Sequence, residues 1–173
     1  QVEACLIEAL HDLLAGDHTC FYKQFAADRE PLIGLAVEHG AQGLSVFDDG
    51  LSWPPDTVSI HRRPLIDRCH TLGQTHRARE GSTWHQVIPI PGNGPGNPEN
   101  FITLARPQAL SDEEMTVADG LIRIYRNYTA LLDYSESDTL TGLLNRKTFD
   151  EFLFRILSSL RLHDDDALGT EVL

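Results

Sequence analysis

The chain has 173 residues, 41% of them hydrophobic, which is enough for one ordinary buried core and some additional structure. Acidic residues outnumber basic ones 26 to 14, and the resulting net charge of −12 repels nucleic-acid phosphates and anionic lipid headgroups. We therefore expect no nucleic acid among the partners. We also expect no membrane contact within this chain, because no apolar run reaches the ~18 residues of a membrane span and the N-terminus does not resemble a signal peptide.

The cysteines are few and irregularly spaced. Cys5, Cys20 and Cys69 are an odd set without C-x-x-C spacing, which argues against both a disulfide framework and a zinc site. We expect reduced thiols, a cytoplasmic location and no metal site in this chain.

Hydrophobic periodicity in the first part of the chain predicts one helix and then short strands. The helix is expected over 2–15, ended by Gly16. The four strands are expected over 19–26, 35–38, 44–47 and 58–61. Gly40 and Gly43 indicate a hairpin between the second and third strands, and residues 27–34 are expected to be a connection.

A second helix is expected from Pro64, which fits the first turn of a helix because its missing N–H has no partner there. Two more strands follow, over 84–90 and 101–105, on either side of a glycine- and proline-rich turn at 91–98. The predicted fold class is therefore α+β, an α/β sandwich with an antiparallel sheet of about six strands and flanking helices.

The clearest local signal is a capping box at Ser111–Glu114, which begins a helix expected to run to about Tyr134. Its apolar residues form two stripes. One heptad-like stripe contains Ala118, Leu121, Tyr125, Tyr128 and Leu132, and the last four are expected to pair with a second copy of the chain. The flanking stripe contains Ile122, Ile124 and Leu131. A homodimer through this helix is expected; the alternative is that both stripes are buried within one chain.

Residues 138–146, D-T-L-T-G-L-L-N-R, resemble the D-x-L-T-G-L-x-N-R motif that opens GGDEF (diguanylate cyclase) domains. The matching positions are Asp138, Leu140, Thr141, Gly142, Leu143, Asn145 and Arg146. Residues 147–162 have one apolar face and resemble the first helix of that family. The alternative is an ordinary helix–turn–helix in which Gly142 ends the first helix.

The resemblance implies an output reaction for the parent protein. GGDEF domains condense two GTP molecules into cyclic di-GMP and pyrophosphate with Mg²⁺ or Mn²⁺, and Asp138, Leu140 and Thr141 would be positioning residues. The metal-binding aspartates, the guanine-reading residues and the GGDEF signature are absent up to Leu173. This chain is therefore expected to lack catalytic residues and cofactors, and to be inactive alone. Asp164–Asp166 are expected to be a solvated run.

The first 134 residues resemble GAF domains in their order of helices and strands. The strand Val87–Ile90, the glycine-rich turn and the capped helix that follows support this, and a PAS-type sensor is the nearest alternative. A GAF-like fold implies a ligand pocket between the sheet and the inserted helix. The candidate pocket residues are Cys69, His70, Trp84 and His85.

The type of ligand stays open. Cys69-His70 faintly resembles the bilin-attaching dipeptide of photosensory GAF domains, and a buried thiol beside a surface histidine is the simpler alternative. A haem or metal bound by histidine is another alternative, through His61, His70, His76 or His85. An unidentified small molecule, or no ligand, also fits.

Together these patterns predict a GAF-like sensor core over 1–110, a connecting helix over 111–137 and a GGDEF fragment over 138–173. The predicted function is the sensory input region of a diguanylate cyclase that acts through a dimeric connecting helix. The alternative is a ligand-free GAF-type dimerisation or interaction scaffold with a degenerate output domain.

Overall fold

The computed structural model describes residues 2–25, 30–48, 54, 56–92 and 99–136. The chain divides into two compact units, Gln1–Arg126 and Asn127–Leu173, and each is described by itself. The motif at 138–146 and the helix expected over 147–162 lie outside the described residues.

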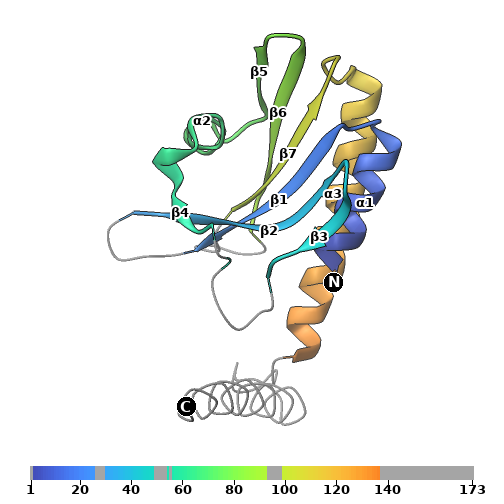
Figure 1. Ribbon diagram of the computed structural model, residues 1–173. Helices are drawn as coiled ribbons and strands as arrows, with labels where there is room; N and C mark the ends of the chain where they lie inside the picture. Colours follow the sequence, from blue (N-terminus) through green and yellow to red (C-terminus); the bar gives the residue numbers. More distant parts are fainter. Residues whose placement is uncertain (1, 26–29, 49–53, 55, 93–98, 137–173) are drawn as a thin grey trace, which may run out of the picture. The chain divides into compact units, whose positions relative to one another are not determined.

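The first unit contains an antiparallel sheet in the spatial order β3-β2-β1-β7-β6-β5, with the short β4 also paired to β2 (Figure 1). Its seven strands are β1 (His18–Phe25), β2 (Leu32–Gly40), β3 (Gly43–Val46), β4 (Val58–Ser59), β5 (His76–Glu80), β6 (Thr83–Ile90) and β7 (Asn100–Arg106). The predicted α+β class and antiparallel sheet are confirmed.

Helices cover both faces of the sheet. α1 (Val2–Leu13) and the first half of α3 (Asp112–Glu136) cover one face, and α2 (Pro64–Leu72) with the short 3-10 turn η1 (Ile60–Arg62) covers the other (Figure 1). The core under α1 and α3 includes Ile7, Leu10, Phe21, Ile102, Leu104 and Ala118. The smaller core under α2 includes Cys20, Ile33, Ile66, Cys69, Val87 and Phe101.

Several boundaries follow directly from local chemistry. Gly43 at φ 89° forms the predicted hairpin, because this left-handed backbone strains residues with a Cβ. Pro64 begins α2, and Gly73 at φ 63° ends it. The capping box is also present: the Ser111 amide donates to Glu114 Oε2 at 2.8 Å, and the Glu114 amide donates to Ser111 Oγ at 3.2 Å.

The structure corrects three predicted elements and adds one strand that the sequence did not predict. β2 already begins at Leu32, inside the predicted connection, and the predicted strand over 58–61 is only two residues long before η1 begins. α1 ends at Leu13, and the positive φ beyond it belongs to Ala15 rather than Gly16. β5 was not predicted at all, because H-R-A-R-E is nearly all polar; its pairing with β6 supplies the backbone hydrogen bonds of an edge strand.

The set of apolar residues that α3 buries in the core differs from the predicted set. Tyr125, assigned to the dimer stripe, is only 7% exposed, packs edge-on against Phe21 at 5.7 Å and donates to Glu3 at 3.4 Å. Ala118 and Ile122 are buried beside it. The exposed apolar residues of the helix are Val117, Ile124, Tyr128 and Leu131, with Leu121 half-buried.

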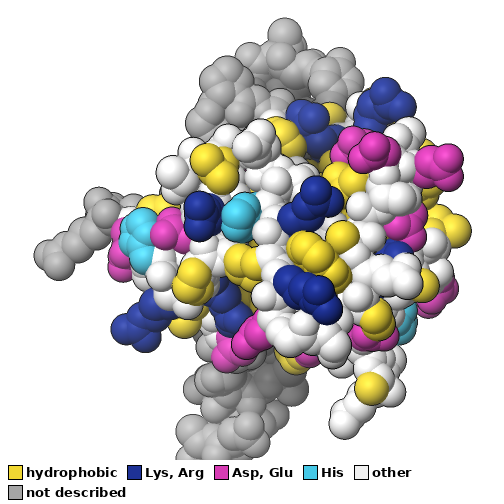
Figure 2. Space-filling view, turned by 90° about the horizontal axis from the view of Figure 1, so that it is seen from above, with side chains coloured by type: hydrophobic (Ala, Val, Ile, Leu, Met, Phe, Trp, Pro, Cys, Tyr) yellow, Lys and Arg dark blue, Asp and Glu magenta, His cyan; other side chains and the backbone are white. Residues whose placement is uncertain are grey.

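Within the described residues, none of the helices is both long and apolar enough to cross a bilayer. The face of the molecule shown in Figure 2 mixes basic, acidic and apolar side chains, so the acidic excess of the sequence does not make this face uniformly negative.

Candidate functional site

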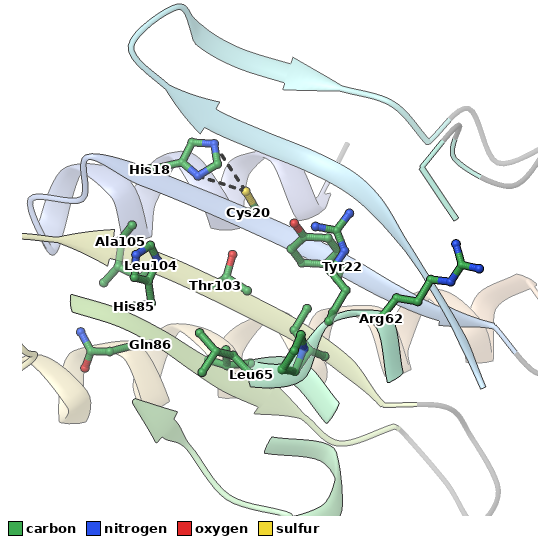
Figure 3. A pocket seen from close by; sticks show the side chains of 14 residues that line it. His18, Cys20, Tyr22, Arg62, Leu65, His85, Gln86, Thr103, Leu104 and Ala105 are labelled. Atoms are coloured by element: carbon green, nitrogen blue, oxygen red, sulfur yellow. Dashed lines mark hydrogen bonds between the residues drawn. The ribbon is translucent and has the colours of Figure 1, made fainter. Parts of the chain in front are cut away.

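A cavity of about 340 Å³ lies between the sheet and the segment formed by η1 and α2 (Figure 3). Strands β1, β6 and β7 form its floor, and η1 with the start of α2 forms its wall. Its polar lining residues are His18, Cys20, Tyr22, Arg62, Arg63, His85, Gln86 and Thr103. Leu65, Ile66 and Val87 are among the apolar ones. This volume and this mixture are typical of a small-molecule site.

Strand register explains why these side chains meet. His18 pairs with Ala105, which pairs in turn with His85, so the two histidines lie in one row across β1, β7 and β6. The neighbouring row joins Glu38, Cys20 and Thr103 across β2, β1 and β7. Because directly opposed residues in antiparallel strands point to the same face, both rows face α2.

His18 of the first row forms a compact polar cluster on β1 and β2 with Cys20 and Glu38 of the second row. His18 Nε2 lies 2.5 Å from Glu38 Oε1, and Cys20 Sγ lies 3.7 Å from His18 Nδ1 and 3.8 Å from Nε2. Burial of Cys20 raises the pKa of its thiol to about 11, so the free thiol stays protonated at neutral pH. The imidazole–carboxylate contact belongs to an ion pair when His18 is protonated.

The opposite wall of the cavity carries positive charge. The Arg63 guanidinium lies over the Tyr22 ring, 5.1 Å from its centroid, in a cation–π contact. Burial raises the pKa of Tyr22 to about 12, so its hydroxyl remains a neutral hydrogen-bonding group. With Arg62 beside Arg63, this wall favours an anionic group on a bound molecule.

Only one of the four predicted pocket residues lines this cavity, within the part of the chain that is described. His85 does so from β6. Cys69 instead points into the small core, where its thiol donates to the Val87 carbonyl at 3.6 Å and burial raises its pKa to about 11. His70 lies edge-on against Phe101, 6.2 Å between ring centroids.

Trp84 is not among the residues that line this cavity. Trp84 and His85 are neighbours on β6, and successive side chains of a strand point to opposite faces. His85 faces α2, so Trp84 lies on the face covered by α1 and α3.

Two of the candidate histidines, His61 and His85, have carboxylate neighbours. His61 Nδ1 lies 3.1 Å from Asp67 Oδ1 at the start of α2, and His85 Nε2 lies 3.8 Å from Glu80 Oε2. His76 lies on the edge strand β5, opposite Val87.

Sequence reasoning missed His18, Cys20, Tyr22, Arg63 and Thr103. The signal that could have found the first three is their alternation on β1: residues 18, 20 and 22 point to one face of a single strand. The side chains that join them come from other strands and from η1, so their convergence depends on the register and the crossover.

No protein-family model matches the chain, and no curated protein matches it. A solved structure does: the GAF domain/HD domain protein from Geobacter sulfurreducens, with a TM-score of 0.55 and 14% identity, over 77% of this chain and 92% of that one. At this identity the match concerns the fold. The fold is GAF-like, as predicted from the order of elements.

Proposed function

We propose that this chain is the sensory input region of a diguanylate cyclase, in which the GAF-like unit binds a small anionic molecule and α3 carries the response to the output domain. The observation that carries the proposal is the position of α3: its first half is part of the sensor core, and its sequence leads directly to the GGDEF-like motif at 138–146.

The cavity supports the ligand-binding part of the proposal. Arg62 and Arg63 lie in the wall of a cavity whose lining also includes Tyr22, Leu65 and Val87, which suits a molecule with a carboxylate or phosphate at one end and an apolar or aromatic body. The Tyr22 ring can contact the apolar or aromatic body of the bound molecule, and the Tyr22 hydroxyl can hydrogen-bond to a polar group of that molecule.

Signal transmission would use the packing on both faces of β1. Tyr22 and Cys20 face the cavity, whereas Phe21 between them packs against Tyr125 of α3. A ligand that displaces β1 would therefore change the fit of Tyr125, and the helix would shift between two packed arrangements. A ligand can shift this population only as far as its affinities for the two arrangements differ.

The dimeric part of the proposal uses the exposed face of α3. The predicted dimer residues Leu121, Tyr128 and Leu132 remain candidates. Leu121 and Tyr128 form one stripe with the other exposed apolar residues of α3, in the order Val117, Leu121, Ile124, Tyr128 and Leu131. These positions recur at alternating steps of four and three, which is the spacing of a coiled-coil seam. Tyr125 is excluded from this seam by its burial.

Light scattering of the purified chain tests the dimer. Ile124→Glu places a charge in the seam and should convert the dimer to monomer. Arg123→Glu, also exposed but on the neighbouring helix face, should leave it dimeric. A wild-type chain that stays monomeric at high concentration contradicts transmission through paired helices.

Two further measurements separate the proposed function from the scaffold alternative. The full-length protein should convert GTP to cyclic di-GMP, detected by chromatography, and no product would favour the scaffold. Anionic metabolites, including nucleotides and dicarboxylates, should raise the melting temperature of the chain. Arg63→Gln should abolish that shift, and Arg77→Gln on β5 should keep it. Absence of any shift contradicts the ligand-binding part.

A further inference from the structure

The polar cluster on β1 and β2 contains three side chains of metal-binding type. His18, Cys20 and Glu38 each offer one ligand atom, and these atoms all lie within 4.8 Å of one another. Two of them lie two residues apart on β1, and the third is fixed beside Cys20 by the β1–β2 register. The site therefore comes from two paired strands of the sheet, a rigid support.

The spacing of the three atoms can be compared with a metal's requirements. Metal–ligand lengths of about 2.3 Å for sulfur and about 2.0–2.1 Å for imidazole nitrogen, at tetrahedral angles, separate the two ligand atoms by about 3.6 Å. Cys20 Sγ lies 3.7 and 3.8 Å from the two His18 nitrogens, close to this separation. Because the sulfur is nearly equidistant from both nitrogens, the imidazole ring must turn to point one lone pair at a shared ion, and the His18 side chain is 48% exposed.

Glu38 needs a small adjustment. Its 2.5 Å contact with His18 Nε2 is a hydrogen bond, whereas two oxygen and nitrogen ligands of one tetrahedral ion lie about 3.4 Å apart. The side chain would withdraw by about 1 Å on binding, as the same arithmetic requires. Its side chain is 35% exposed and that of His18 is 48% exposed, so neither is locked by packing.

Space for an ion and a further ligand exists on both sides of the cluster. His18 and Cys20 line the cavity under α2, and His18 and Glu38 also line a second hollow of about 200 Å³ over the β2–β3 turn. A site with three protein ligands and an open position is the arrangement of zinc centres that bind water or an exogenous ligand.

We propose that His18, Cys20 and Glu38 bind a divalent transition-metal ion, Zn²⁺ or a similar borderline ion, with an open position facing the cavity. On binding, the thiol releases its proton to solvent and coordinates as thiolate. A thiolate and a carboxylate then neutralise the two positive charges of the ion. Mixed sulfur, nitrogen and oxygen ligands select Zn²⁺, Co²⁺ or Fe²⁺ over Mg²⁺ and Ca²⁺.

The site requires only the folded sheet and does not depend on the proposed output activity. It would add a direct coordination point for an anionic ligand at the end of the cavity opposite Arg63. Metal binding and ligand-induced stabilisation are measured separately, so failure of one is distinguishable from failure of the other.

Titration of the full chain with Co²⁺ under reducing conditions tests the proposal. We expect the near-ultraviolet charge-transfer band of a cobalt–thiolate bond, together with the intense visible bands of four-coordinate Co²⁺, and Zn²⁺ should displace both. Cys20→Ser should abolish the charge-transfer band. His18→Gln and Glu38→Gln should weaken binding by more than the roughly 10–100-fold that loss of an outer-shell partner costs.

Matched controls use the other two cysteines. Cys5→Ser and Cys69→Ser should bind Co²⁺ as the wild type does, and circular dichroism should show every variant folded. If Cys20→Ser does not fold, the variants at His18 and Glu38 decide. The proposal is overturned if the wild type gives no thiolate band, if Cys20→Ser retains it, or if both His18→Gln and Glu38→Gln bind with wild-type affinity.

Discussion

Arg106, at the end of β7, joins three elements of the first unit through one buried guanidinium. It is 8% exposed, and Nη1 donates to the Leu14 carbonyl after α1 at 2.5 Å and to Glu114 Oε1 in the first turn of α3 at 2.7 Å. The other oxygen of Glu114 accepts the capping hydrogen bond from Ser111. Arg106 therefore fixes where α3 leaves the sheet.

We predict that Arg106→Met lowers the free energy of unfolding by about 2–4 kcal/mol. Two hydrogen bonds to a charged group are lost, each worth about 1.5–3 kcal/mol, while the methionine retains part of the apolar contact of the arginine stem. This is a large share of the 5–15 kcal/mol typical of a domain. Urea unfolding followed by circular dichroism measures the change.

Arg123→Met is the matched control, because Arg123 is exposed on α3 and its loss should change stability by less than about 0.5 kcal/mol. A difference of under 0.5 kcal/mol between the two variants would refute the reasoning.

Glu114→Gln adds a pH test. Hydrogen bonds from Ser111 and Arg106 lower the pKa of Glu114, so its contribution is present above the ordinary value of about 4.3 and is lost as pH falls through the folded value. The wild type should therefore lose more stability on acidification than Glu114→Gln.

Two further predictions concern histidine and cysteine. His11 of α1 stacks on His39 of β2 at 3.8 Å between ring centroids. Burial is the larger cause and repulsion by the nearby His39 the smaller cause that lower the pKa of His11. The unfolded chain therefore protonates His11 more readily than the folded chain, and the melting temperature should fall as pH drops below about 6.5. The fall should be less steep in His11→Gln, and equal slopes of melting temperature against pH in the two proteins would contradict the prediction. Among the thiols, exposed Cys5 should react rapidly with a disulfide reagent, whereas Cys20 and Cys69, whose pKa values burial raises to about 11, should react only after denaturation; fast labelling of all three would disprove their burial.

Local chemistry made much of the first unit predictable. The capping box at Ser111, Pro64 at the start of α2 and Gly43 in the hairpin act through their own backbone or their nearest neighbours, so their effects appear in the sequence itself. The apolar residues of β6 and β7 and the glycine- and proline-rich turn between them likewise gave the positions of these strands to within a residue or two.

The elements that sequence reasoning missed depend on partners elsewhere in the chain. β5 has too few apolar residues to be recognised, and only its pairing with β6 makes it a strand. On α3, both Tyr125 and Tyr128 fit an apolar stripe. Only the packing of Phe21 against Tyr125 shows that Tyr125 is the one buried in the core.

The sequence by itself determined the helices and most of the strands, the capped start of α3 and the motif at 138–146, because each depends on residues within a few positions of one another. Tertiary structure alone decided the site. Glu38 reaches Cys20, and His85 falls in line with His18, only through the register of β2, β1, β7 and β6. A one-residue slip of any of these strands would turn its side chains to the other face, and nothing in the spacing of these residues along the chain records that choice.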